Sequence, residues 1–209
     1  ANDCGPSSKN VLIAAETASG EGKAVVSVGS VNRRMPFMLG DAALSRPRFD
    51  LLLDHERYEH DPFCIPNAAI GDVEHALGLN AASLVRDGGT LQLGIGELGE
   101  SIVYALQLRH QRNDVYRHVL GLTGVAERFR KTIEDVGGFG SLDRGIFANT
   151  EMFVDGFLEL YRSGILSRRV YPHATLQRLL DDGVVTERPD EEMLVAFSRA
   201  GMSHIDLRE

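Results

Sequence analysis

Residues 87–102, with the sequence DGGTLQLGIGELGESI, constrain the fold of this 209-residue chain more than any other segment. The run 90–93 predicts a short strand, the glycines after it predict a tight turn, and Leu98, Ile102 and Leu106 have the spacing of an amphipathic helix. A strand that turns directly into a helix is the building unit of parallel α/β folds. Because these folds bind ligands at the carboxyl ends of their strands, the turn places bare backbone N–H groups where a ligand is expected.

Other patterns extend this unit into a larger α/β region. A helical apolar pattern begins at Ile70 and stops at residues 87–89, and short strands are expected at 49–54 and 146–148. The β-branched run 23–31 predicts a further strand, buried within the sheet. We therefore expect an α/β fold with an open, mostly parallel sheet and flanking helices.

The second half of the chain is predicted to be largely helical. Residues 113–144 show a mixed helical pattern that ends in a glycine-rich loop. Thr150 is expected to cap a helix that ends at Gly164. The apolar stripe of that helix comprises four side chains, Phe153, Phe157, Leu160 and Tyr161.

Two short helices are expected at the end of the chain, at residues 174–182 and 189–200. Acidic residues open the second of them, as the helix dipole favours. We therefore expect two domains, an α/β region over residues 1–172 and a small helical extension over 173–209.

Composition argues against several classes of function. The chain has 22 basic and 30 acidic residues, a formal net charge of −8, so it offers no general attraction to nucleic acid or to an anionic membrane. No apolar run approaches the roughly 20 residues that span a bilayer, and the N-terminal residues lack the features of a signal peptide, so we expect a soluble, cytoplasmic protein. Cys4 and Cys64 are expected to be free thiols. The chain does not begin with Met, which suggests a piece of a longer protein.

The turn after the strand, Gly94-Ile95-Gly96-Glu97-Leu98-Gly99, satisfies the dinucleotide-binding fingerprint. Asp114 lies at about the sequence spacing after this turn at which the fingerprint expects a ribose-binding acid. That acid should end a second strand, whereas residues 100–112 have the pattern of a continuous helix. A purely structural turn, in which glycines let a helix and a strand approach closely, is the other alternative.

The charge-rich run 54–64 includes His55, His60 and Cys64 and invites a metal interpretation. The two histidines are five residues apart and would diverge by about 140° on a helix, so a zinc-protease pair is not expected. We expect a solvated loop there and no metal site.

Charged side chains elsewhere allow two interpretations. Glu151 and Asp155 form an acidic pair where a helix follows a strand, a position near a substrate, although carboxylates at a helix N-terminus also stabilise it by roughly 0.3–1 kcal/mol each. Five arginines either meet the phosphates of a nucleotide-like ligand or lie on a solvated surface. They are Arg33, Arg34, Arg162, Arg168 and Arg169.

Three segments resemble the acetyl-CoA hydrolase/transferase family, relatives of succinyl-CoA:acetate and 4-hydroxybutyrate CoA-transferases. They are VNRRMP at 31–36, DGGTLQLGIG at 87–96 and NTEMFVDGFLELYRSGIL at 149–166, and they follow the order that the family uses. Together they cover most of residues 24–185. The longer third segment is similar to a bacterial branch with longer chains, so the chain resembles an internal segment of such a member.

The resemblance implies a fold of two related α/β halves, of which this chain spans the end of one and the start of the next. It implies that Gly94, Ile95 and Gly96 lie near the acyl-binding end of the site. Asn149 and Glu151, at the carboxyl end of the strand expected at 146–148, are expected to contact substrate or CoA there. Family chemistry uses a glutamate that attacks the acyl-CoA thioester, with backbone N–H groups holding the oxyanion. That glutamate belongs to a later segment, so no catalytic residue is expected in this chain.

The resemblance further implies coenzyme A as a substrate with no tightly bound cofactor, acyl-CoA and a small carboxylate as partners, and a homo-oligomer. The acyl group and its acceptor, water or a carboxylate, stay open. Two other functions also stay open, a nucleotide-cofactor oxidoreductase domain built on the glycine turn and a non-catalytic interaction module. We expect the chain on its own not to turn over acyl-CoA.

Overall fold

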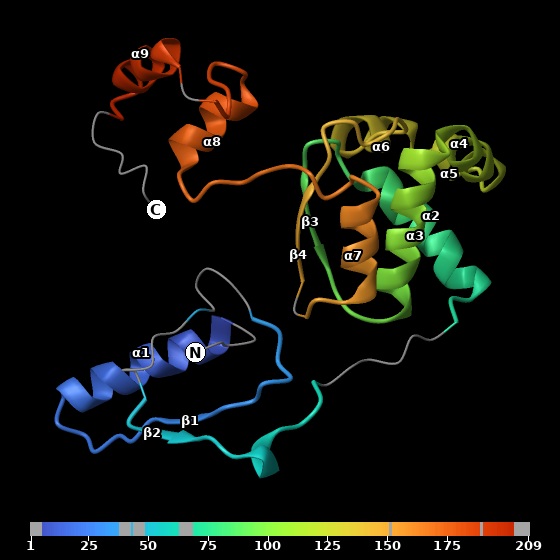
Figure 1. Cartoon of the computed structure of the whole chain (residues 1–209). Coiled ribbons are helices and arrows are strands. Elements are labelled where there is room, and N and C mark those ends of the chain that lie inside the picture. The colour runs from blue at the N-terminus through green and yellow to red at the C-terminus, as the bar shows by residue number, and fades with distance from the viewer. Residues whose placement is uncertain are drawn as a thin grey trace. The chain divides into compact units, whose positions relative to one another are not determined.

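The computed structural model describes residues 6–37, 43, 49–62, 69–150, 152–188 and 190–202 (Figure 1). The chain divides into two compact units, an N-terminal unit, Ala1–Ala68, and a C-terminal unit, Ala69–Glu209. Within the described residues, each unit contains one pair of parallel strands together with helices, which confirms the predicted α/β class. Among the described residues, no helix combines the length and apolar character needed to cross a membrane.

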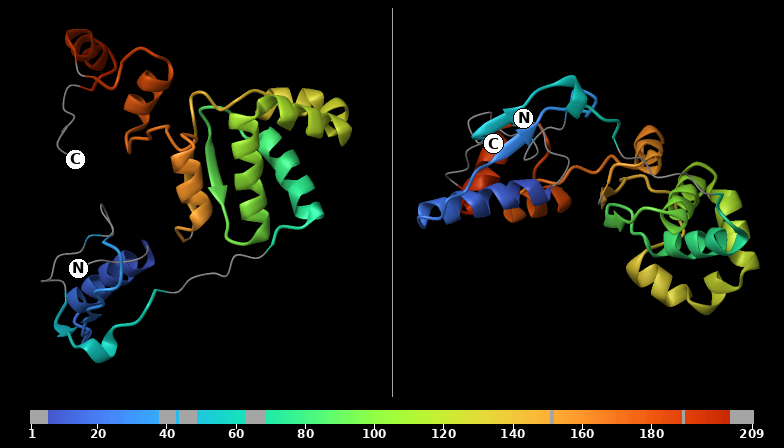
Figure 2. Two further views of the ribbon diagram at one scale, coloured as in Figure 1. Left: turned by 45° about the vertical axis from the view of Figure 1, so that its right-hand side comes forward. Right: turned by 90° about the horizontal axis from the view of Figure 1, so that it is seen from below.

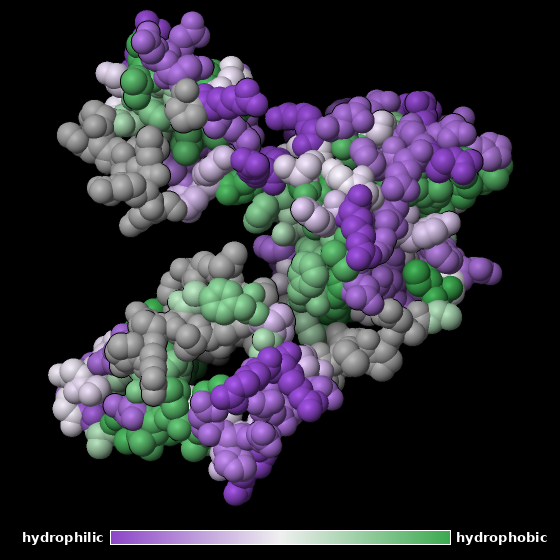
Figure 3. All heavy atoms as spheres, viewed as in Figure 1, coloured by the Kyte–Doolittle hydropathy of each residue, from purple (hydrophilic) through white to green (hydrophobic). Residues whose placement is uncertain are grey.

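The N-terminal unit holds helix α1 (Pro6–Gly20), strands β1 (Val28–Ser30) and β2 (Leu51–Leu53), and the short 3-10 helix η3 (Glu56–Tyr58). The two strands pair in parallel, with Val28 opposite Leu51. The prediction of a buried strand over 23–31 is wrong, because only Val28–Ser30 pairs and its side chains are not buried. Apolar side chains accordingly lie at the surface of this unit (Figure 3). A β-branched run favours a strand, but it carries no information on whether other elements cover it.

The C-terminal unit is built around strands β3 (Thr90–Leu93) and β4 (Phe147–Thr150), which pair in parallel. Helices α2 (Asp72–Leu84), α3 (Glu97–Gln111) and α7 (Asp155–Arg162) pack in the order α2, α3, α7 (Figure 2). The connection between α3 and β4 contains three shorter helices, α4 (Asn113–Leu122), α5 (Val125–Arg128) and α6 (Arg130–Val136). These elements confirm the strand, turn and helix order expected from the sequence.

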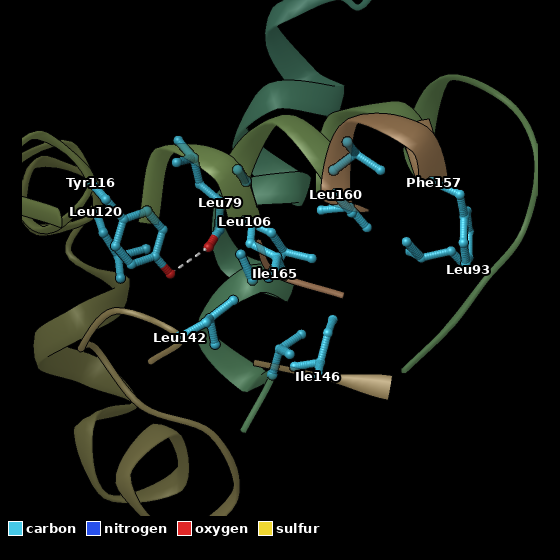
Figure 4. Close-up of a cluster of buried hydrophobic side chains, with 14 residues drawn as sticks. Leu79, Leu93, Leu106, Tyr116, Leu120, Leu142, Ile146, Phe157, Leu160 and Ile165 are labelled. Atoms are coloured by element: carbon cyan, nitrogen blue, oxygen red, sulfur yellow. Dashed lines mark hydrogen bonds between the residues drawn. The ribbon is translucent and has the colours of Figure 1, made fainter. Parts of the chain in front are cut away.

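The core of the C-terminal unit lies between this sheet and the helices around it, including α2, which precedes β3 (Figure 4). Leu93, Leu106 and Ile146 are buried there, and Phe157 and Leu160 of α7 join them. The spacing assigns Leu98 to the apolar face of α3 with Leu106, but Leu98 is 49% exposed, so its predicted burial against the sheet is wrong. It lies in the first turn of α3, where the helix passes the end of the strands.

Helix α7 begins later than the sequence suggested. Thr150 is the last residue of β4 and donates its hydroxyl hydrogen bond to the Met152 carbonyl, while Val154 occupies the cap position. The predicted stripe is half correct, because Phe153 and Tyr161 are exposed whereas Phe157 and Leu160 are buried. Gly164 ends the helix with a φ of 77°, a left-handed conformation that favours glycine.

Arg109 is an unexpected member of this core, since its side chain is 1% exposed. Its guanidinium donates hydrogen bonds to the carbonyl oxygens of Ala82 (2.5 Å), Val85 (2.6 Å) and Gly140 (2.6 Å). Two of these carbonyls belong to the carboxyl end of α2, where the helix dipole is negative. Burial lowers the pKa of Arg109, but the guanidinium ties α2, α3 and the loop after α6 together.

Helices α8 (Ala174–Asp181) and α9 (Glu191–Arg199) confirm the helical extension. They surround a second small apolar cluster, formed by Val185, Phe197 and Met202. An ion pair of 2.9 Å between Arg168 and Asp181 joins α8 to the segment that precedes it. The assignment of this extension as a separate domain beginning at residue 173 stays a prediction.

Candidate functional site

The carboxyl ends of β3 and β4 meet at one edge of the sheet, because the register pairs Gln92 with Asn149 and Leu93 with Thr150. Gly94, Ile95 and Gly96 follow β3 directly and lead into α3. The structure therefore brings four of the five predicted site residues, Gly94, Ile95, Gly96 and Asn149, to the same edge. The fifth, Glu151, lies outside the described residues.

The glycines of the turn have different roles. A Cβ on Gly94 or Gly96 would meet no heavy atom within 4 Å, so the backbone there is bare on the side that a side chain would occupy. Gly96 has a φ of 109°, which side chains rarely adopt. A Cβ on Gly99, by contrast, would collide with the Gly94 carbonyl oxygen. Gly99 therefore serves helix packing, whereas Gly94 and Gly96 leave room for an approaching ligand.

Two acidic side chains lie beside this edge, at the starts of the helices that follow the strands. Glu100 belongs to the first turn of α3, and Asp155 is the first residue of α7. Burial, and to a lesser extent the charge of Asp155, raise the pKa of Glu100 above its ordinary value. A Cβ on Gly156 would lie 3.1 Å from Glu100 Oε1, so that carboxyl packs directly over the first turn of α7. Sequence reasoning singled out Asp155 but missed Glu100, whose importance depends on a contact between helices far apart in the chain.

The dinucleotide alternative is disfavoured by the same geometry. Helix α3 runs without interruption from Glu97 to Gln111, and Asp114 lies in the first turn of α4. A ribose-binding acid should instead stand at the end of a neighbouring strand. The fingerprint therefore matches the local strand and helix but lacks the acid.

Arg33 and Arg34, the two arginines of the N-terminal unit that the sequence singled out, are already paired. Arg33 bonds to Asp54 (2.6 Å) and Glu59 (2.8 Å), and Arg34 bonds to Asp61 (2.7 Å). The hydrogen bonds that Arg33 donates to Glu59 and Asp54 raise its pKa. The run 54–62 is exposed or half-buried, in agreement with the solvated loop expected there, and its acids neutralise the two arginines. Cys4 and Cys64 lie outside the described residues, within which no three His, Cys, Asp or Glu side chains gather as metal ligands would.

Comparison with known proteins supports the resemblance stated from the motifs. No family model matches the chain. The chain resembles the CoA-transferase and acetyl-CoA hydrolase family over part of its length. A curated relative, the 4-hydroxybutyrate coenzyme A transferase of Clostridium kluyveri, is 29% identical over 144 residues, which cover 68% of this chain and 24% of that protein. The chain thus spans about a quarter of the length of this relative.

Solved structures with a related chain include a 4-hydroxybutyrate CoA-transferase from Porphyromonas gingivalis, at 27% identity and a TM-score of 0.41. That match covers 67% of this chain and 26% of the other. A structure of RipA matches at 20% identity and a TM-score of 0.44, covering 67% of this chain and 24% of the other.

Proposed function

We propose that this chain supplies part of the substrate-binding edge of an acyl-CoA transferase or hydrolase, with Gly94, Ile95 and Gly96 facing the acyl group or the pantetheine arm of CoA. The observation that carries the proposal is the open space at Gly94 and Gly96, at the carboxyl end of a parallel strand, in a chain similar to a CoA transferase. Ligands of open α/β folds bind at this end of the strands.

The bare turn suits thioester chemistry because a carbonyl group must come close to backbone N–H donors. Attack on a thioester carbonyl places negative charge on its oxygen, and preorganised N–H groups stabilise that charge. Asn149, at the end of β4, is proposed to contact the same substrate, and Glu151 is proposed to contact it from the segment that follows. Neither is proposed as the nucleophile.

The nucleophile is proposed to be a glutamate outside this chain. Its carboxylate oxygen attacks the acyl-CoA carbonyl, the C–S bond breaks, and CoA leaves as a thiolate, so that a mixed anhydride remains. The thiolate then attacks the glutamyl carbonyl, which gives a glutamyl-CoA thioester and releases the acyl group as a carboxylate. In transfer, an incoming carboxylate attacks the glutamyl carbonyl and displaces the CoA thiolate, which then attacks the new acyl carbonyl of the mixed anhydride, so that a new acyl-CoA forms and the glutamate is freed. In hydrolysis, water attacks the glutamyl carbonyl instead, and free CoA and the glutamate are released.

The wider proposal follows from the family resemblance. Acyl-CoA and a small carboxylate are the partners, coenzyme A is a substrate with no tightly bound cofactor, and neither nucleic acid nor membrane is a partner. The enzyme acts in the cytoplasm as a homo-oligomer, and the chain alone does not catalyse turnover.

Binding and turnover are tested separately. Backbone amide NMR of the 209-residue chain should show saturable shifts at residues 94–96 with acetyl-CoA and none with NAD. Gly96→Val should abolish these shifts, because its side chain fills the approach path and a residue with a Cβ strains the positive φ. Gly121→Val is the matched control, since a Cβ there also meets no atom within 4 Å but lies on α4. Shifts with NAD alone would favour the oxidoreductase alternative, and no shift with any ligand would favour an interaction module.

Turnover is followed by release of free CoA and by intact mass after hydroxylamine treatment. We expect no release above background, because the nucleophile and its oxyanion donors must lie within about 3 Å of one carbonyl. A covalent adduct on Glu151 would show that the catalytic residue lies in this chain after all.

A further inference from the structure

A cleft of about 320 Å³ lies in the C-terminal unit, away from the glycine turn. The segment 167–171 forms one wall, Arg144 contributes from the loop before β4, and α8 with the residues after it forms the other wall. Arg168 donates a hydrogen bond of 3.3 Å to the Thr90 hydroxyl, at the start of β3. The cleft is therefore at the amino ends of the strands, the edge opposite the candidate site.

Three arginines line this cleft, Arg144, Arg168 and Arg169. Arg168 donates to both carboxylate oxygens of Asp181, at 2.9 and 3.2 Å, and Arg169 pairs with Glu187 at 3.0 Å. Among the described residues, no carboxylate lies within ion-pair distance of the Arg144 side chain, whose guanidinium packs over the backbone of Gly88. Among the residues that line the cleft, three cations thus face two carboxylates. A third carboxylate, that of Asp87, lies outside the lining and accepts from the Arg144 backbone N–H at 2.9 and 3.1 Å.

Arg168 is held in place rather than free to move. Its side chain is only 17% exposed, and its backbone N–H donates to the carbonyl of Ile146 beside the start of β4. Its Nε atom is buried and has no hydrogen-bond partner among the described residues. Because this Nε atom is buried, a ligand in the cleft can meet only the Nη atoms of Arg168, which already donate to Thr90 and Asp181. A guanidinium held in this way binds an oxyanion with little further loss of entropy.

We infer that this cleft binds a phosphate group, either as the free ion or as the monoester of a small molecule. Arg144 and Arg169 supply the exposed contacts and Arg168 the half-buried one. The volume is at the lower end of the range for small-molecule sites, which suits a phosphate with a small organic part. This inference does not depend on the proposed acyl-CoA function, since it concerns the opposite edge of the sheet.

Inorganic phosphate is the first probe, added to the 209-residue chain at an ionic strength matched with sodium chloride. Backbone amide NMR should show saturable shifts at residues 167–171 and in α8. The double variant Arg144→Gln/Arg169→Gln should weaken phosphate binding by about tenfold or more, because each charged hydrogen bond contributes strongly to affinity. Both side chains are exposed, so the variant should keep its fold.

The matched control is Arg117→Gln/Arg162→Gln, which removes the same charge from exposed positions on α4 and α7. It should bind phosphate as the unmodified chain does. Equal weakening by the two double variants, or shifts that sodium chloride alone reproduces, would overturn the inference. Tighter binding of ribose 5-phosphate than of inorganic phosphate would identify a monoester as the ligand, and equal or weaker binding would identify the free ion.

Discussion

The two parallel strand pairs of this chain have similar lengths but opposite environments. In the N-terminal unit, Val28 of β1 is 52% exposed and Leu51 of β2 is 56% exposed. In the C-terminal unit, Leu93 of β3 is 3% exposed, beneath the helices that follow the strands. Parallel strands are normally buried on both faces, and a two-stranded sheet is at best marginally stable in isolation. The comparison shows that helices packed on the sheet, rather than the strand ladder, stabilise the C-terminal unit.

Buried polar groups make the difference larger. None of the described side chains of the N-terminal unit is buried, whereas the C-terminal unit buries Arg109, Ser83 and Ser101 together with the Tyr116 hydroxyl. Such groups need partners, because an unpaired buried donor or acceptor costs about 1–3 kcal/mol. The C-terminal unit should therefore respond strongly to single substitutions and the N-terminal unit weakly.

Arg109→Met should have the largest effect. It leaves the carbonyls of Ala82, Val85 and Gly140 without their buried donor, and we expect a loss of about 3–5 kcal/mol in the free energy of unfolding. Urea titration, followed through amide signals of the C-terminal unit, measures it. Arg117→Met on the exposed side of α4 is the control and should change stability by less than about 0.5 kcal/mol. A loss below about 1 kcal/mol for Arg109→Met would mean that water replaces the guanidinium.

Leu106→Ala and Leu51→Ala make the same side-chain truncation, one in each unit, and together they test the comparison. Leu106 is fully buried, so the cavity should cost about 2–5 kcal/mol. Leu51→Ala in β2 makes the same truncation at a side chain that is 56% exposed, and should cost less than about 1 kcal/mol. Signals specific to each unit are needed because the two units need not unfold together. Equal losses would contradict the contrast drawn between the two strand pairs.

Tyr116→Phe should have a smaller effect. The hydroxyl donates to the Leu79 carbonyl at 3.1 Å (Figure 4), and its loss should cost about 0.5–1.5 kcal/mol. Burial raises the pKa of Tyr116 from 10 to about 12, so the unfolded chain releases this proton first as the pH increases. The chain should therefore lose stability between pH 10 and 12, and Tyr116→Phe should lack this component. If the free energy of unfolding changed equally with pH for the unmodified chain and for Tyr116→Phe across that range, the hydroxyl would be in contact with water.

The sequence predicted best where the signal was local. Periodicity located α2, α3 and the two strands of the C-terminal unit, and the glycine turn identified the carboxyl edge. The failures concern contacts between distant segments. The sequence does not show whether other elements bury residues 23–31, nor that Arg109 is buried because it caps the carboxyl end of α2. Leu98 lies at the expected helical spacing, but its position at the end of the sheet leaves it exposed. Glu100 was missed because its contact is with the first turn of α7, far away in the sequence.

Glu100→Gln should have the smallest effect and the clearest dependence on pH. Burial and the charge of Asp155 raise the pKa of Glu100 in the folded chain, so the unfolded chain loses this proton first as the pH rises above about 4.5. Stability therefore falls as the pH rises from there through the folded pKa, and Glu100→Gln avoids that fall. The variant should match the unmodified chain near pH 4 and be more stable near pH 7, as measured by urea titration at each pH.

The control for this prediction is Glu97→Gln, which removes the same charge from an exposed side chain of the same turn. An equal gain at pH 7 for both variants would attribute the effect to net charge alone. A loss of stability in Glu100→Gln at pH 7 would show that the ionised carboxylate makes a favourable contact with the first turn of α7. In either case the buried Glu100 carboxylate would not destabilise the carboxyl edge of β3 and β4 at pH 7. That edge would then not differ in this respect from the exposed strands of the N-terminal unit.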